Sequence, residues 1–239
     1  MSSAADAFTR FAQNLGNKIE APVRHHLLRV YACLAATTFC ASLGAIVHLF
    51  GLFEAGLLSA FGSIGLALYL SFSVDDPKNF YTRLGCLLGF GFLTGHSIGP
   101  LLDIVISIEP QVVVTALIGT CVIFVALSCS ALLADRGSFL FLGGIIMSVL
   151  STMALFGLAN IFIQSQIIFQ AHLYIGLIAM AAFVLFDTQM IMEKRRAGST
   201  DCIKHSMDLF FDLVSMFRRL LIILTQKEER EQQRRRKNK

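Results

Sequence analysis

Charged residues are scarce in this chain. Asp, Glu, Lys and Arg make up only 15% of its 239 residues, hydrophobic residues make up 55%, and the mean hydropathy is +0.68. Soluble globular domains carry about 25% charged residues. So apolar a sequence leaves no room for a sizeable water-soluble domain, which excludes a soluble enzyme, a nucleic-acid-binding module and a secreted disulfide scaffold. The chain is therefore expected to be an integral membrane protein.

Metal-ligand spacings and a cleavable signal peptide are also lacking. No Cys-x-x-Cys or Cys/His ligand spacing occurs, and most of the cysteines lie in apolar runs, where they pack as small hydrophobic residues. His48, His96 and His172 lie singly in apolar runs and are expected to be packing residues. We therefore expect no metal site and no resident cofactor. Residues 1–26 are polar, so the first apolar run is expected to serve as the membrane signal.

Six apolar segments are long enough to cross the hydrocarbon, for which a helix needs about 20 residues. They cover residues 27–50, 52–72, 84–108, 112–134, 139–163 and 167–192. A seventh segment, 203–224, carries several charges and cannot face lipid on all sides, so it is expected to be central, re-entrant or interfacial. The sequence predicts an all-α, polytopic membrane helix bundle. Its parts are a cytoplasmic segment (1–26), the bundle (27–224) and a basic tail (225–239).

Lysine and arginine alternate between the connections in a way that indicates orientation. They occur before the first span, between spans two and three, between four and five, and after six, whereas the other loops contain none. The positive-inside rule then places the N-terminus in the cytoplasm. The cationic tail is also expected to be cytoplasmic, as a disordered charge run or as a contact with anionic lipid, which conflicts with a full seventh crossing. Arg236 and Lys237 near its end look like a basic retrieval signal of the endoplasmic reticulum.

A stripe of small residues marks the third span. Gly91, Gly95 and Gly99 recur every fourth residue, which lines one helix face with glycine and lets a neighbouring backbone approach closely. Pro100 follows directly and is expected to kink or open the helix. The pattern predicts tight helix packing, or alternatively a hinge that helps gate a pathway.

Three aspartates lie where carboxylates are costly. Asp187 is at the cytoplasmic end of the sixth span, and Asp208 and Asp212 share one face of the seventh segment. An ionised carboxylate in hydrocarbon costs on the order of 2.5–3.5 kcal/mol, so acids in spans are functional-site hypotheses. If the seventh segment packs antiparallel to the sixth after its short connection, Asp187 faces the other two acids.

Two carboxylates in a low dielectric do not both ionise easily, so such a pair holds one proton and can sense pH without a cofactor. When the proton leaves, the added charge is offset by water, by an arginine or by a cation such as Ca²⁺, which prefers oxygen ligands. This supplies a mechanism for proton-dependent cation passage. The alternative is that Asp187 and Asp212 only cap or pin helices, or pair with Arg218 or Arg219.

Five short stretches together resemble the Bax inhibitor-1 family. They are GHSIGP (95–100), TALIGT (115–120), SFLFLGG (138–144), FDTQ (186–189) and DLFFDL (208–213). The resemblance runs from about residue 20 through the basic tail. It implies a seven-helix bundle whose last helix is central.

The resemblance also implies a function. It indicates a protein of the endoplasmic-reticulum membrane that suppresses programmed cell death, lowers the store of Ca²⁺ through a pH-sensitive leak and damps the unfolded-protein response. Its expected partners are the lipid bilayer, cell-death regulators, and channels or stress sensors of the endoplasmic reticulum, with no nucleic acid. The family's paired-aspartate pH sensor corresponds to Asp187 and Asp212, with Asp208 adjacent. Arg83 is the nearest candidate for the arginine that latches one aspartate in the closed state.

Two other classes of function compete with an ion leak. An intramembrane aspartyl protease also needs two embedded aspartates, but Phe211 precedes Asp212 where that class has GxGD, so no enzymatic activity is expected. A non-conducting interaction protein, acting through the tail or the bundle on cell-death proteins or channels, is the remaining alternative.

Overall fold

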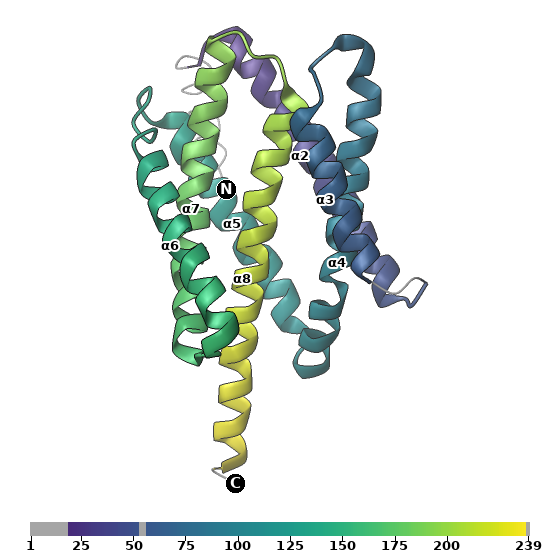
Figure 1. Cartoon of the computed structure of the whole chain (residues 1–239), viewed down its shortest axis with the longest axis vertical. Helices are drawn as coiled ribbons and strands as arrows, with labels where there is room; N and C mark the ends of the chain where they lie inside the picture. The colour runs from purple at the N-terminus through teal and green to yellow at the C-terminus, as the bar shows by residue number, and fades with distance from the viewer. Residues whose placement is uncertain (1–18, 53–55, 238–239) are drawn as a thin grey trace, which may run out of the picture.

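The computed structural model describes residues 19–52 and 56–237, and within these ranges it contains helices and no strands (Figure 1). The long helices are α2 (Ala21–Leu49), α3 (Leu57–Phe72), α4 (Phe80–Ile108), α5 (Gln111–Leu133), α6 (Leu142–Ile163), α7 (Gln166–Arg196) and α8 (Cys202–Lys237). A 3₁₀ turn, η1 (Pro77–Asn79), precedes α4. The predicted all-α membrane bundle is confirmed.

Two helices begin at positions that the apolar pattern does not give. α2 starts at Ala21, with Pro22 in its first turn, so the first helix already includes residues 21–26. Proline suits a first helical turn because its missing N–H has no partner to lose there. α3 has only 16 residues, fewer than the roughly 20 needed to span. Five of the described helices are long and apolar enough to cross a membrane, and α3 is a shorter apolar helix beside them.

α8 occupies the centre of the bundle. It packs against α2, α3, α4, α5 and α7 (Figure 1). Its 36 residues form one uninterrupted helix, about 54 Å long at 1.5 Å per residue. The central position is one of the three expected for the polar segment, and α8 contains no re-entrant turn.

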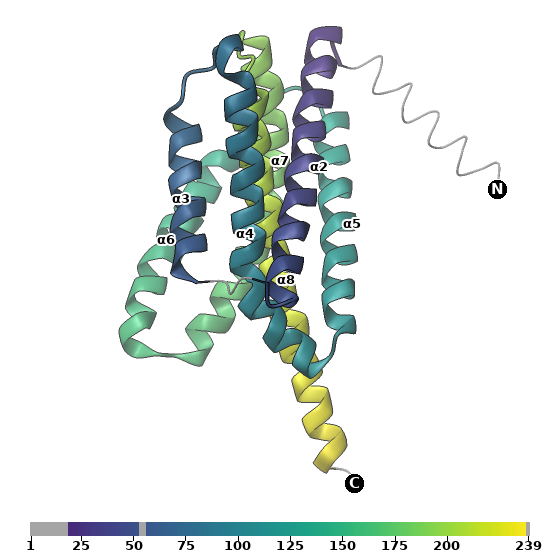
Figure 2. The ribbon, with the colours of Figure 1, turned by 90° about the vertical axis from the view of Figure 1, so that its right-hand side faces the viewer.

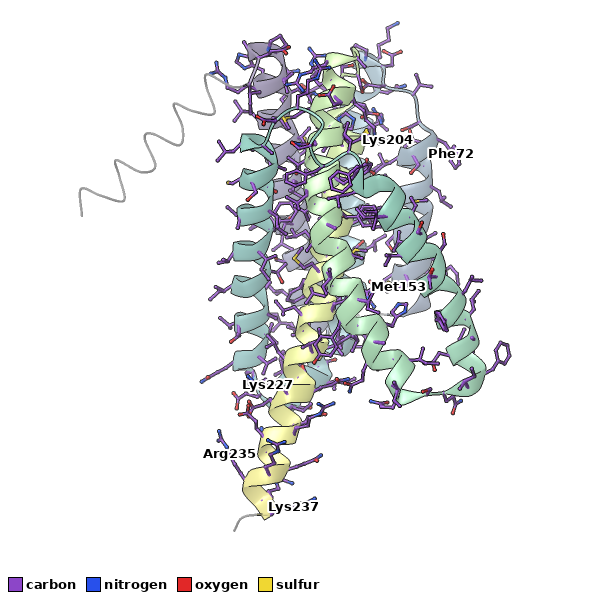
Figure 3. All side chains as sticks on the ribbon, turned by 90° about the vertical axis from the view of Figure 1, so that its left-hand side faces the viewer. Phe72, Met153, Lys204, Lys227, Arg235 and Lys237 are labelled. Carbon is purple, nitrogen blue, oxygen red and sulfur yellow. The ribbon has the colours of Figure 1, made fainter. Side chains whose placement is uncertain are left out.

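The basic tail emerges at the opposite end of the molecule from the start of α2. Lys204 lies at one end of the bundle, and Lys237 lies beyond the other end (Figure 3). α2 begins at the Lys204 end (Figure 2). The start of α2 and the end of α8 thus lie at opposite ends of the bundle (Figure 2 and Figure 3), and a cytoplasmic location for both ends of the chain stays a prediction.

The tail is also helical rather than an irregular charge run. α8 continues through Lys237, and Glu231 lies 4.0 Å from both Lys227 and Arg235. Oppositely charged residues four apart on a helix stabilise it by a few tenths of a kcal/mol per pair. Glu, Gln, Lys and Arg are in addition good helix formers.

The outer surface of the bundle is apolar. Large hydrophobic side chains are exposed along α2, α5 and α6, among them Phe39, Ile118 and Phe156. α6 is the most peripheral of these helices, since only Ile146 and Met153 are buried on it. An apolar exterior of this extent fits contact with the hydrocarbon of a bilayer, and the protein is a multi-pass membrane protein.

Candidate functional site

The three acids meet where α7 packs against α8. Asp212 is 5% exposed, and its carboxyl group lies close to that of Asp187. Asp208 lies one turn earlier on α8, partly buried and close enough to act electrostatically on both. The three acids thus lie near one another, as the four-residue spacing on α8 and the short α7–α8 connection predict.

No cation neutralises this acidic group at close range. In the described part of the chain, none of the three carboxyl groups lies within 4.0 Å of a Lys, Arg or His nitrogen. Lys194 and Lys204 act on Asp208 from a greater distance. The second oxygen of Asp212, Oδ2, has no hydrogen-bond donor there. Within the described residues, the acids therefore form a largely buried group whose charge is offset only by lysines at a distance.

Arg218 and Arg219 do not pair with the acids. The Nη1 of Arg219 donates to the backbone oxygen of His172 at 2.9 Å, and Arg218 is exposed. Gly176 makes room for this guanidinium, since a Cβ there would lie 2.1 Å from Nη1. The pairing that we considered as an alternative for Asp187 and Asp212 is absent from this structure.

Arg83, the candidate latch, binds other acids. Its guanidinium is 1% exposed and donates to Asp75 at 3.1 Å and to Asp201 at 2.7 Å. Its Nε also donates to the Ser73 hydroxyl at 2.9 Å. Asp212 lies eleven residues beyond Asp201, about 16 Å further along α8. A contact between Arg83 and the aspartate pair is thus not made in this conformation, and Arg83 instead joins the α3–α4 connection to the turn before α8.

A second contact that the sequence pattern does not indicate holds the same end of α8. His26 Nε2 lies 2.9 Å from His205 Nδ1, and both rings are buried. His26 escapes prediction because it precedes the first apolar run. Pro22, as a helix-start residue, is the signal that extends α2 to include it.

Gln189, in the FDTQ stretch, organises the neighbouring loop. Its Oε1 accepts from the Phe139 amide at 2.8 Å, and its Nε2 donates to the carbonyls of Asp135 and Ala131 at 3.1 and 3.4 Å. The side chain is 1% exposed. Gln189 thereby binds the C-terminal end of α5 and holds the α5–α6 loop against α7. It follows Asp187 and Thr188 directly in the sequence.

The glycine stripe of α4 lies directly against α2. A Cβ on Gly91 would lie 2.6 Å from the Thr37 carbonyl oxygen, one on Gly95 1.8 Å from that of Ala41, and one on Gly99 2.1 Å from the His48 ring. The two backbones are therefore in close contact. Pro100 lies inside α4, which continues to Ile108, so the helix is not interrupted at this position.

Two of the histidines within the spans form hydrogen bonds with polar neighbours. His48 Nε2 lies 2.9 Å from Asp103 Oδ2, and His96 Nδ1 lies 2.9 Å from Ser59 Oγ. Among the residues that the structure describes, no group of three or more His, Cys, Asp or Glu side chains is arranged to hold a metal ion.

Buried hydroxyl groups from four helices lie in the interior at about the same level along the bundle as the acids. Tyr31 is beside Ser128 and Thr188, Thr188 follows Asp187, and Ser206 precedes Asp208 on α8. None of these four hydroxyls has a hydrogen-bond partner within the described ranges. Buried polar groups normally satisfy one another or bind water, so this part of the interior can accommodate polar or ionic species.

The helical region as a whole is similar to one family of proteins. The family model described as "Inhibitor of apoptosis-promoting Bax1" matches residues 23–229. A Drosophila melanogaster protein named Bax inhibitor 1 is 49% identical, over 90% of this chain and 88% of the relative. The Homo sapiens Bax inhibitor 1 is 45% identical over 90% of each chain, and the Arabidopsis thaliana one is 37% identical over 85% of this chain and 82% of the relative.

Proposed function

The chain belongs to the Bax inhibitor 1 family, and from this membership we propose that it is an anti-apoptotic protein of the endoplasmic-reticulum membrane that lets Ca²⁺ leak from the store in a pH-dependent way. It acts as a regulator and not as an enzyme. A lowered Ca²⁺ store would in turn damp the unfolded-protein response. Cell-death regulators and other channels or stress sensors of that membrane are the proposed partners.

The observation that carries the ion leak is the buried Asp187–Asp212 contact without a cation beside it. Two carboxyl groups in contact in a low dielectric are stable when they share one proton, and loss of that proton leaves two charges that repel. Repulsion across the α7–α8 interface favours a separated arrangement of these helices. A divalent cation with oxygen ligands is then attracted to the same place.

The interior hydroxyl groups support a path through the bundle rather than a fixed binding site. The aspartate pair, Asp208 and the hydroxyls of Tyr31, Ser128, Thr188 and Ser206 offer oxygen atoms from α2, α5, α7 and α8. Ca²⁺ takes about 6–8 oxygen ligands when it is held firmly. A cation passing along successive, incomplete sets of oxygen atoms is bound weakly enough to leave again. Separation of α2 from the Gly91–Gly99 face, next to Pro100, is the proposed way in which the bundle widens.

For orientation, we propose that the end carrying the start of α2 and the α7–α8 turn is cytoplasmic. The lysines and arginines of three connections, α3–α4, α5–α6 and α7–α8, lie there together with those at the start of α2, as the positive-inside rule requires. The helical tail then lies on the lumenal side. A retrieval role for Arg236 and Lys237 needs a cytoplasmic tail, and so it requires the opposite orientation.

Ca²⁺ efflux from proteoliposomes tests the leak. The purified chain is compared with Asp187→Asn, Asp212→Asn and, as a matched control on α4, Asp103→Asn, from mildly acidic to neutral pH. We expect efflux that depends on pH in the wild type and in Asp103→Asn, and that loses this dependence in the two variants of the pair. Folded protein that shows no efflux at any pH would contradict the leak and favour action through bound partners.

A further inference from the structure

A second feature lies on the other side of α8 from the aspartates. A cavity of about 290 Å³ is enclosed by α2, α4, α5 and α8. Almost all of the surface that it presents belongs to carbon atoms. For comparison, an apolar cavity of about 150 Å³ is large enough to bind benzene and stays free of water.

The mouth of the cavity lies between α2 and α5. Ile46 and Leu49 of α2 and Leu117 of α5 line it and are 44, 40 and 47% exposed, whereas its lining residues on α4 are buried, as is Phe210 on α8. α2 and α5 both border this side of the molecule (Figure 2), yet they do not pack closely on each other as they both do on α8. The opening is therefore sideways, at a level where the protein surface contacts the bilayer.

The cavity offers a polar ligand no free hydroxyl donor. Three hydroxyl groups line it, and each already donates to a carbonyl oxygen of its own helix: Thr38 at 2.8 Å, Ser42 at 3.1 Å and Thr120 at 2.7 Å. No charged side chain lines it. Its contents must therefore be apolar.

We propose that this cavity is a binding site for one acyl chain of a membrane lipid, which enters between α2 and α5. The occupant follows from continuity with the bilayer interface. The mouth opens into the hydrocarbon, where acyl chains are the surrounding solvent, and residues next to it such as Val114 and Ile118 are 56 and 60% exposed to that solvent. The site needs no ion path and stands independently of the proposed leak.

An acyl chain in this cavity would lie against α8, the helix that carries Asp208 and Asp212. Phe210, Leu213, Val214 and Phe217 of α8 form the inner wall, and Phe210 is 0% exposed. Phe211, by contrast, is 44% exposed and does not line the cavity. Contact with Phe210 therefore reports an acyl chain inside the bundle, whereas contact with Phe211 reports lipid around the bundle.

The experiment uses the full chain in liposomes containing a phospholipid with a photoactivatable diazirine in its acyl chain. After irradiation, trypsin cuts at Lys204 and Arg218, and the modified positions in the peptide between them are located by tandem mass spectrometry. We expect adducts on the inner-wall residues of α8 in addition to adducts on Phe211. Adducts on Phe211 and other outward-facing residues alone would overturn the proposal.

Variants that fill the cavity give the second measurement. Ala45→Phe on α2 and Val113→Phe on α5 place a ring in it, and Ala36→Phe and Val114→Phe place the same ring on exposed positions of the same helices. We expect each filling variant to lower inner-wall adducts several-fold while Phe211 adducts remain, and the controls to change neither. The two filling variants lie on opposite walls, so one remains informative if the other does not fold.

A photoactivatable sterol, used in a parallel experiment, distinguishes an acyl chain from a sterol as the occupant of the cavity. Labelling of the inner wall by the sterol and not by the phospholipid would show an apolar site for a different ligand and would contradict the acyl chain. Inner-wall labelling by the phospholipid that is unaffected by both filling variants would also contradict it, because the label would then reach α8 by another route.

Discussion

The guanidinium of Arg83 lies 2.7 Å from the carboxylate of Asp201, a residue 118 positions away in the sequence. With Asp75 on its other side, the arginine joins the connection before α4 to the turn that starts α8. Removal of one partner of a buried ion pair leaves the other charge without compensation. The contact therefore fixes the position of the N-terminal end of the central helix.

Arg83→Ala is expected to destabilise the folded protein by about 3 kcal/mol, the low end for a buried ion pair because Asp75 is about a third exposed. Thermal unfolding in detergent measures the change. Arg136→Ala is the control, because Arg136 pairs with Glu193 at the same end of the bundle but is 67% exposed. Equal shifts in melting temperature for both variants would contradict the assigned role.

Gly95→Ala is expected to force α2 and α4 apart. The new Cβ would lie 1.8 Å from the backbone oxygen of Ala41, and overpacking of this kind costs about 1–3 kcal/mol or more. Gly85 is on the same helix, and a Cβ there would meet nothing within 4 Å, so Gly85→Ala should be neutral or slightly stabilising by helix propensity. Melting temperatures of the two alanine variants make the comparison, and a harmless Gly95→Ala would count against the close α2–α4 contact.

Gln189→Leu is expected to loosen the α5–α6 connection. It leaves the Phe139 amide without its acceptor, at about 1–3 kcal/mol for a buried group left unsatisfied. Hydrogen exchange at the Phe139 amide should accelerate. The exposed Gln111, changed to Leu in the same way, serves as the control and should leave that exchange rate unchanged.

Because α8 runs from one end of the bundle to beyond the other (Figure 3), we expect epitope tags at the two ends of the chain to lie on opposite sides of the membrane. Protease protection in sealed microsomes measures this directly. The expected result is a digested N-terminal tag and a protected C-terminal tag. Digestion of both tags in intact vesicles would show that α8 does not cross the membrane and that the tail is cytoplasmic.

Periodicity and length account for most of the helices. The apolar runs predict α4 to α7 to within a few residues because hydrocarbon thickness and side-chain polarity decide those helices almost alone. α3 begins at Leu57 instead of residue 52, and α2 begins at Ala21 instead of residue 27, since hydropathy does not determine where a helix starts. The tail is helical because local charge pairs, which a hydropathy reading ignores, stabilise it.

The aspartate contact was predictable, and the partners of Arg83 were not. Asp208 and Asp212 share a face by helix geometry, and a short connection brings Asp187 to them. Asp75 and Asp201, in contrast, lie in connections whose positions depend on how whole helices pack. No spacing along the chain relates either residue to an arginine on α4.

The long central helix has a mechanical consequence. Arg83 and His26 hold its first turn through Asp201 and His205, while its last turns extend past the bundle (Figure 3). A helix held at one end moves most at its far tip, and a tilt of about 5° over a length of about 54 Å displaces that tip by about 5 Å. In the proposed mechanism, repulsion between the carboxylates near the held end would therefore produce its largest displacement at the other end of the bundle.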